Sequence, residues 1–181
     1  TWLDAQNAYA DACLGDPDPD VVTALMTATS SAEFEIKGLQ AAGDKVFGLA
    51  TIAPSMRPCL VFFPQKALLG AEAPPHHVIW DPLMWDQEGH TRLDWFVASP
   101  DGVYVAASLS KHGSELGDAH IFEVATGRCV ERGPRVNNGI SGGHLRWLSD
   151  SRSFIYTAFR GPKAEGEPFS LYRHRLMEPW H

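Results

Sequence analysis

Cysteine is scarce in this sequence, and the residue strings that bind zinc are absent. The three cysteines, Cys13, Cys59 and Cys129, are widely spaced and odd in number. This pattern is typical of free or buried thiols, and it favours a reducing compartment such as the cytoplasm while leaving the localisation open. Neither Cys-x-x-Cys nor His-Glu-x-x-His occurs. We therefore expect no metal and no other cofactor.

Long apolar runs and clusters of positive charge are also missing. The longest apolar stretches, near residues 59–63 and 121–124, have the length of a strand and fall far short of the roughly 20 residues that span a bilayer. The formal net charge is -7, and the Lys and Arg residues are scattered. No basic face is therefore available for a phosphate backbone. We expect a protein that binds neither membranes nor nucleic acids.

What remains is an ordinary globular composition, with 44% hydrophobic and 20% charged residues. Residues 1–31 have apolar side chains at helical spacing, interrupted by Asp16-Pro17-Asp18-Pro19, where proline stops helical propagation. We expect one or two helices in this segment, the second with Asp20 as its N-cap. From residue 32 to residue 181, short β-branched and aromatic runs between Gly, Pro and Asp indicate strands. The clearest candidates are residues 46–52, 60–63, 93–98, 104–108, 120–124, 154–159 and 170–174.

An internal repeat is the most informative feature of the second segment. The turn Ser99-Pro100-Asp101-Gly102 aligns with Ser149-Asp150-Ser151-Arg152 at a shift of 50 residues, and the strands that follow align at the same shift without a gap. Repeats of this length that contain several short strands are typical of propeller blades. The segment has room for about three four-stranded antiparallel blades, whereas closed propellers have at least about four. The predicted fold is mainly β: a partial β-propeller over residues 32–181, preceded by the helical segment 1–31.

Several motifs together resemble the prolyl oligopeptidase family, serine peptidases in which a propeller caps an α/β-hydrolase domain. Trp2, Gln6 and Asn7 resemble the family's N-terminal helix, and Trp80-Asp81-Pro82 resembles the segment that enters a blade. The turn at residues 98–102 is similar to the family's Ser-Pro-Asp-Gly turn. The motifs that follow it, in the family's order, lie at residues 110–115, 124–127, 147–150, 154–156 and 172–176.

The sequence departs from the family at two places. Arg152 stands where a Gly often follows the Asp of the second turn, and Ile140 is the only bulky apolar residue in a stretch where some members have a substrate-contacting aromatic. We therefore carry no pocket residue over from the family. The resemblance implies the N-terminal propeller region, as a fragment without the catalytic Ser, His and Asp of the α/β-hydrolase domain.

One string does match the nucleophile pattern Gly-x-Ser-x-Gly, namely Gly139-Ile140-Ser141-Gly142-Gly143. A nucleophile elbow requires a helix directly after the serine. Here the residues after Ser141 predict a strand and a hairpin turn, so we interpret the string as a blade connection. We assign no catalytic, cofactor-binding or metal-binding residue in this chain.

Two pairs of possible metal ligands are interpreted as solvated loop residues. His76 with His77, and Asp118 with His120, each offer two ligands, whereas a zinc site needs three or four.

Aromatic and polar residues around the repeated turns are assigned to packing and to loops. Trp95 and Trp147, which precede the turns, are expected in the core between blades. The polar loop with Ser110, His112, Ser114 and Glu115 is interpreted as a solvated turn, with a position facing the channel or the catalytic domain as the alternative.

The function that the resemblance implies is that of the substrate-gating part of a serine endopeptidase that hydrolyses short peptides. Its partners would be the α/β-hydrolase catalytic domain of the same parent chain and short peptide substrates. Family members differ in cleaving after proline or after basic residues, and the sequence leaves both open. A noncatalytic propeller that binds a peptide or protein through its blade loops is the alternative. A third possibility, an independent hydrolase using Ser141, predicts labelling by a fluorophosphonate, and we expect none.

Overall fold

The structure is a computed structural model, which describes residues 1–15, 18–23, 34–52, 57–68, 75–114, 116–136, 145–158 and 170–180. Its contacts divide the chain into two compact units, Thr1–Glu33 and Phe34–His181. Among the described residues, every helix is too short or too polar to cross a membrane.

The first unit contains helix α1, Trp2–Leu14, which begins with a capping box. The Thr1 hydroxyl accepts a hydrogen bond from the Asp4 backbone N–H at 3.3 Å, and the Asp4 carboxylate accepts one from the Thr1 amino group at 2.6 Å. These two bonds satisfy backbone donors that a helix start leaves without partners. The helix ends at Gly15, whose φ of 65° is readily accessible only to glycine.

A second helical segment covers residues 19–23. Its N-cap is Asp18, whose carboxylate accepts a hydrogen bond from the Asp20 backbone N–H at 2.8 Å. The expectation that Asp20 is the cap was wrong. Pro19 stands in the first helical position, where its missing N–H costs nothing, so the helix begins before Asp20 rather than after it.

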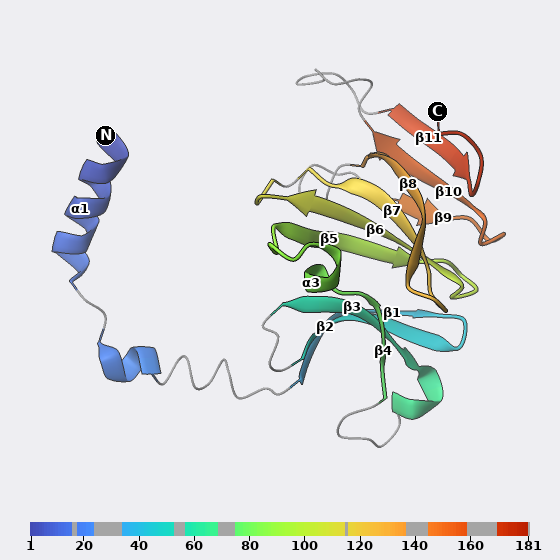
Figure 1. Ribbon diagram of the computed structural model, residues 1–181, viewed down its shortest axis with the longest axis horizontal. Coiled ribbons are helices and arrows are strands. Elements are labelled where there is room, and N and C mark those ends of the chain that lie inside the picture. Colours follow the sequence, from blue (N-terminus) through green and yellow to red (C-terminus); the bar gives the residue numbers. More distant parts are fainter. Residues whose placement is uncertain are drawn as a thin grey trace. The chain divides into compact units, whose positions relative to one another are not determined.

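The second unit consists of three antiparallel sheets (Figure 1). The first sheet comprises β1 (Phe34–Ala42), β2 (Lys45–Ile52), β3 (Pro58–Pro64) and β4 (His77–Trp80), with the short 3-10 helix η1 (Gln65–Leu68) between its last two strands. The second comprises β5 (Thr91–Ala98), β6 (Tyr104–Lys111), β7 (Asp118–Glu123) and β8 (Arg128–Arg135), and helix α3 (Pro82–Trp85) precedes it. The third contains β9 (Leu145–Trp147), β10 (Ser153–Ala158) and β11 (Ser170–Arg175).

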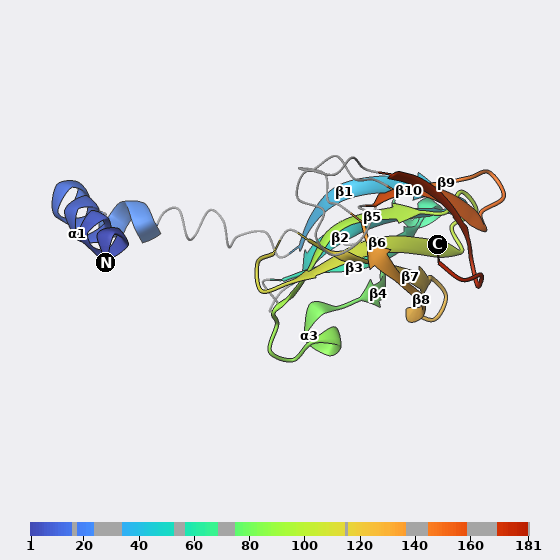
Figure 2. The ribbon, with the colours of Figure 1, turned by 90° about the horizontal axis from the view of Figure 1, so that it is seen from above.

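In every sheet the strands follow one another in chain order, so each sheet is a simple meander. Figure 1 shows the sheets one above another in sequence order, from cyan through green and yellow to orange-red, and in Figure 2 they overlie one another. The first strands of successive sheets are neighbours, since β1 contacts β5 and β5 contacts β9. Successive meanders with adjacent first strands are the arrangement of propeller blades, and the predicted partial propeller is confirmed.

Two apolar layers hold the blades together. Strand β6 supplies residues to both, because alternate side chains of a strand point to opposite faces. Val105 and Leu109 pack towards the first sheet, together with Phe47, while Ala106 packs towards the third sheet. The second sheet is therefore buried on both faces, as a blade between two others must be.

The repeat is real, but its offset differs from the expected shift of 50. Ser99 N–H bonds the Tyr104 carbonyl at 2.8 Å, and Leu148 N–H bonds the Ser153 carbonyl at the same distance, so the turns correspond at a shift of 49. The bonds from Val124 to Val103 and from Leu176 to Arg152 place the next strands at a shift of 52. An ungapped alignment averages these two values, because the connection from β10 to β11 is longer than that from β6 to β7.

Candidate functional site

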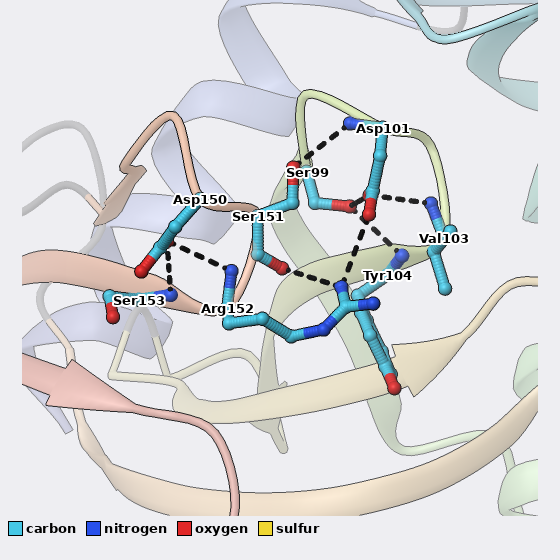
Figure 3. Close-up of polar contacts among 8 residues, drawn as sticks. All are labelled: Ser99, Asp101, Val103, Tyr104, Asp150, Ser151, Arg152 and Ser153. Carbon is cyan, nitrogen blue, oxygen red and sulfur yellow. Dashed lines mark hydrogen bonds and ion pairs between the residues drawn. The ribbon is translucent and has the colours of Figure 1, made fainter.

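The two repeated turns are built around aspartates that accept backbone hydrogen bonds. Asp101 accepts the Val103 N–H at 3.0 Å, and Asp150 accepts the N–H groups of Arg152 and Ser153 at 3.0 and 2.8 Å (Figure 3). These two bonds lower the pKa of Asp150 to about 2. Short polar side chains that bond the backbone two residues on are typical turn formers. In the second and third blades, the turn sequence therefore fixes where the second strand begins, at β6 and β10.

The corrected offset changes which residue occupies the strained position. Gly102 has φ 68°, and its counterpart in the second turn is Ser151, with φ 55°. The departure from the family at Arg152 is therefore not one of backbone conformation, because Arg152 lies one position beyond the left-handed residue. Ser151 adopts a conformation that costs a side chain roughly 1–2 kcal/mol, and its hydroxyl offsets part of this by accepting the Asp101 N–H at 3.1 Å.

Arg152 links the second and third blades directly. Its Nη1 donates to the Asp101 carboxylate at 3.1 Å, and its guanidinium lies over the Tyr104 ring, 4.9 Å from the centroid (Figure 3). Both partners belong to the second blade, so a single side chain joins two turns. The ion pair is about 40% exposed on each side, and such pairs contribute at most about 1 kcal/mol.

The turns of the first and second blades meet through backbone alone. Gly43 N–H bonds the Pro100 carbonyl at 3.1 Å. A Cβ at Gly43 would lie 2.6 Å from the Asp101 carbonyl oxygen, and one at Gly102 would lie 2.8 Å from that of Ala42. Glycine is required at both positions, because they combine positive φ with an approach closer than any side chain permits.

The first strands of the blades are joined by side chains that bond a neighbouring main chain. The Gln40 side-chain amide in β1 donates to the Phe96 carbonyl at 2.7 Å and accepts the Ala98 N–H at 3.2 Å. It therefore bonds two main-chain groups of β5. From the other side, Trp147 in β9 donates its Nε1–H to the Val97 carbonyl at 2.9 Å. All three bonds are partly buried, and they link the adjacent first strands β1, β5 and β9.

A buried His–Glu pair joins the outer part of the second blade to the third. His174 Nε2 lies 2.5 Å from a carboxylate oxygen of Glu131, whose other oxygen accepts the Met177 N–H at 3.0 Å. The His174 ring is stacked on Trp180 at 3.8 Å between centroids. Gly133 allows this packing, because a Cβ there would meet the Trp180 ring at 2.5 Å.

The expected packing role of two tryptophans is confirmed. Trp95 and Trp147 are half-buried against the apolar layer between the second and third sheets.

The expectation of a solvated turn holds for only part of the polar loop. His112 and Ser114 are exposed, but Ser110 is buried at the end of β6 and donates to the Asp94 carboxylate at 2.6 Å. Glu115 lies outside the described residues. The strand continues into this polar segment, where Ser108 and Ser110 are buried and both donate to the Asp94 carboxylate of the neighbouring strand β5.

The interpretation as loop residues is wrong for His77, which begins β4, and for Asp118 and His120, which lie in β7. The histidine rings engage in local packing. His77 is stacked on Phe62 at 4.7 Å between centroids, and His76 lies near Phe63 at 6.0 Å. His120 has its Nδ1 2.9 Å from the Asp118 carbonyl. Within the described ranges, no three His, Cys, Asp or Glu side chains gather in a group that could hold a metal ion.

The Gly139 to Gly143 string, including Ile140 and Ser141, lies outside the described residues.

A cleft that the sequence did not predict lies at the end of the second sheet where β6 stops and β7 begins. Its volume is about 630 Å³, and its walls include Trp85 of α3, Lys111 of β6 and Arg132 of β8. The residues come from segments almost 50 positions apart, and strand register brings them together. Composition and local spacing carry no signal for such a site.

Comparisons with known proteins agree with this geometry. Residues 58–179 match the family profile described as the prolyl oligopeptidase N-terminal beta-propeller domain. Prolyl oligopeptidase ophP of Omphalotus olearius is 28% identical over an alignment 130 residues long, which covers 63% of this chain and 17% of the relative.

Two solved structures show the same fold. A structure from a study of two prolyl endopeptidases superposes with a TM-score of 0.66 and 24% identity, covering 98% of this chain and 24% of that one. Oligopeptidase B from Leishmania major gives a TM-score of 0.62 at 15% identity, covering 89% of this chain and 25% of that one.

The chain thus spans about a quarter or less of the length of these relatives. The profile covers more than half of the chain, and the sheets that it covers are stacked as blades joined through their turns and first strands. The chain belongs to the prolyl oligopeptidase family, and it corresponds to part of that family's N-terminal β-propeller domain.

Proposed function

We propose that this chain is the substrate-gating propeller of a serine peptidase that hydrolyses short peptides. The match of residues 58–179 to the propeller domain of a peptidase family carries the proposal. The catalytic Ser, His and Asp would stand on an α/β-hydrolase domain joined to this chain in a longer protein. A triad of this kind needs a serine, a base and an orienting carboxylate held at hydrogen-bond distance.

The propeller's contribution would be exclusion by size. A ring of blades restricts access to a short, extended peptide, and enclosure also shields the reaction from bulk water. The rigid links between blades support this role. The Gln40 amide and the Trp147 indole bond the main chain of β5 from both sides, so the first strands resist being pushed apart by a folded substrate.

Proline is the residue after which we propose that the parent protein cleaves. Two of the relatives are named for proline, the prolyl oligopeptidase ophP and the prolyl endopeptidase. Cleavage after a basic residue is the competing specificity. The two are separated by the substrates in the experiment below.

Helix α1 offers a surface for the proposed catalytic domain. None of its residues is buried, and the large apolar side chains Trp2, Leu3, Tyr9 and Leu14 are 60–83% exposed. Trp2 and Tyr9, seven positions apart, lie on the same side of the helix. Exposed apolar faces of this kind mark interaction surfaces, and we propose that α1 packs on the α/β-hydrolase domain.

The experiment uses the longer protein, with the 181-residue chain as control. A fluorescent fluorophosphonate should label the longer protein on one serine and leave the 181-residue chain unlabelled. Two matched decapeptides, one with an internal Pro and one with an internal Arg in its place, are then incubated with the longer protein and analysed by mass spectrometry. Cleavage after Pro supports the proposal, cleavage after Arg alone overturns the proline specificity, and no cleavage with no labelling favours a noncatalytic peptide-binding propeller.

A further inference from the structure

The cleft at the end of the second sheet combines an apolar floor with a cationic rim. Leu109 lies in the floor and is only 5% exposed, while Trp85 of α3 forms a wall. Lys111 at the end of β6, Arg135 at the end of β8 and Arg132 in the middle of β8 form the rim. The cleft's volume of about 630 Å³ lies in the range of pockets that hold small ligands, roughly 300–1,000 Å³.

Among the described residues that line the cleft, the positive charges exceed the negative ones. Asp118 is the carboxylate in the described lining, and its Oδ1 lies 3.6 Å from Arg135 Nε. Lys111 and Arg132 form no ion pair with any described carboxylate. Two cationic groups therefore remain for an anionic ligand in a chain whose formal net charge is -7. A local excess of charge against the overall sign is the pattern of a recognition site rather than of general surface composition.

Aromatic packing holds Arg132 in place. Its guanidinium carbon lies 5.3 Å from the centroid of the Trp85 ring. That ring is itself fixed by edge contacts with His120 and Phe122, at 5.4 and 5.7 Å between centroids. The guanidinium group is planar, and stacking on an aromatic face fixes the orientation of its plane while the N–H groups at its edge stay able to donate two parallel hydrogen bonds to a carboxylate.

His120 adds a neutral group beneath the rim. Burial lowers its pKa, and the charges of Arg132 and Lys111 act in the same direction, against the hydrogen bond to the Asp118 carbonyl. Its ring is therefore uncharged near neutral pH, so the positive charge of the cleft rests on the Lys and Arg side chains.

We propose that this cleft binds an acidic side chain of a peptide, with the carboxylate held by Arg132 and Lys111. The apolar floor at Leu109 and the wall at Trp85 accept the aliphatic part of the same side chain or of its neighbour. A peptide fits these features better than an inorganic anion does, because a small anion uses only the rim. The inference rests on the proposed function in that it names acidic peptides as a substrate class, and it is tested separately from catalysis.

The experiment measures binding by the longer protein. Two fluorescein-labelled octapeptides without Pro, Lys or Arg are compared by fluorescence anisotropy, one with two adjacent Glu residues and one with Gln in their place. The Glu peptide should bind about fivefold more tightly, since each exposed charge pair contributes up to about 1 kcal/mol. Raising the salt concentration should reduce the difference.

Matched variants locate the binding site. R132Q should remove most of the preference for the Glu peptide. R128Q makes the same change on the same strand, at a residue outside the cleft lining, and should preserve it. Equal effects of R132Q and R128Q would overturn the inference, as would competition by inorganic phosphate at the same concentration as the Glu peptide.

The outcomes also separate this inference from the proposed function. Cleavage of the proline decapeptide with no preference for the Glu octapeptide would defeat the acidic-peptide site and leave the peptidase standing. A preference that depends on Arg132 in a protein that cleaves nothing would defeat the peptidase and retain the binding site.

Discussion

At the scale of single residues, burial controls the chemistry of the thiols. Cys59 is buried in β3, and burial, together with the nearby Asp81 charge, raises its pKa to about 11. Cys13 is exposed on α1. Because the thiolate is the reactive form, alkylation by iodoacetamide at pH 8 should modify Cys13 and leave Cys59 intact in the native protein. Peptide mass spectrometry measures this, with urea-unfolded protein as the control in which both react; rapid native labelling of Cys59 would contradict the fold of the first blade.

The turn aspartate Asp150 makes stability depend on pH. Its pKa is lowered from the usual value of 3.8 to about 2 by hydrogen bonds from the Arg152 and Ser153 N–H groups. A carboxyl group with a lowered folded-state pKa stabilises the fold above its unfolded-state pKa and loses this contribution as the pH falls through the folded-state value. D150A should therefore lower the melting temperature at pH 7, and the difference from wild type should shrink between about pH 4 and pH 2.

The control for this prediction is D150N, which keeps an oxygen acceptor without the charge. The melting temperatures of D150N and D150A should differ by a similar amount across the same pH range. A difference between wild type and D150A that persists unchanged at pH 2 would show that charge at residue 150 is not what supports the turn.

Residue-level chemistry was only partly accessible from the sequence. The two turns with Asp101 and Asp150 were recognised because these side chains bond backbone groups only two or three residues away, and such local bonds leave a recognisable sequence motif. Gln40 was missed, because its two partners, Phe96 and Ala98, lie 56 and 58 positions away. Trp85, Lys111 and Arg132 were missed for the same reason, since strand register rather than spacing brings them to one cleft.

At the scale of elements, the backbone contact between neighbouring turns can be tested with one methyl group. Gly102 and Gly113 both have positive φ, 68° and 73°, but a Cβ at Gly102 would lie 2.8 Å from the Ala42 carbonyl oxygen while one at Gly113 would meet nothing within 4 Å. Both G102A and G113A incur the conformational cost of about 1 kcal/mol. Only G102A also forces two blades apart, at a further cost of about 2 kcal/mol.

The measurement is urea unfolding of the two variants beside the wild type. G102A should lose about 3 kcal/mol and G113A about 1 kcal/mol of unfolding free energy, reasoning from the strain and overpacking costs of core substitutions. Equal losses in the two variants would mean that the turns of the first and second blades do not touch.

The predicted strands correspond to β2, β3, β5, β6, β7, β10 and β11, whereas β1, β4, β8 and β9 were missed. Strand β8 contains Arg128, Gly133 and Pro134, a composition that reads as loop. It is nevertheless a strand, paired with β7 at the edge of the sheet. Pro134, which has no N–H to donate, is tolerated there because an edge strand pairs on one side only. Strand β1 was missed because Gly38, at a register shift, interrupts its pattern. The composition of an outer or irregular strand resembles that of a loop, so periodicity alone cannot separate them.

At the scale of the whole molecule, the described blades form one stack, and the proposed function places the catalytic residues on another domain. The blades share two apolar layers and are linked turn to turn and strand to strand. The predicted repeat and the family motifs were sufficient to identify a partial propeller. They were not sufficient to place the cleft or the exact offset, because both depend on how far each loop extends between paired strands.

The most direct measurement compares two substrates of the longer protein. One is a free decapeptide containing Pro, and the other is the same ten residues inserted in an exposed loop of a stably folded protein. Gated hydrolysis predicts that mass spectrometry finds cleavage of the free peptide and none of the folded host over the same time. Cleavage of both at equal rates would contradict gating by the propeller, and cleavage of neither would contradict the peptidase itself.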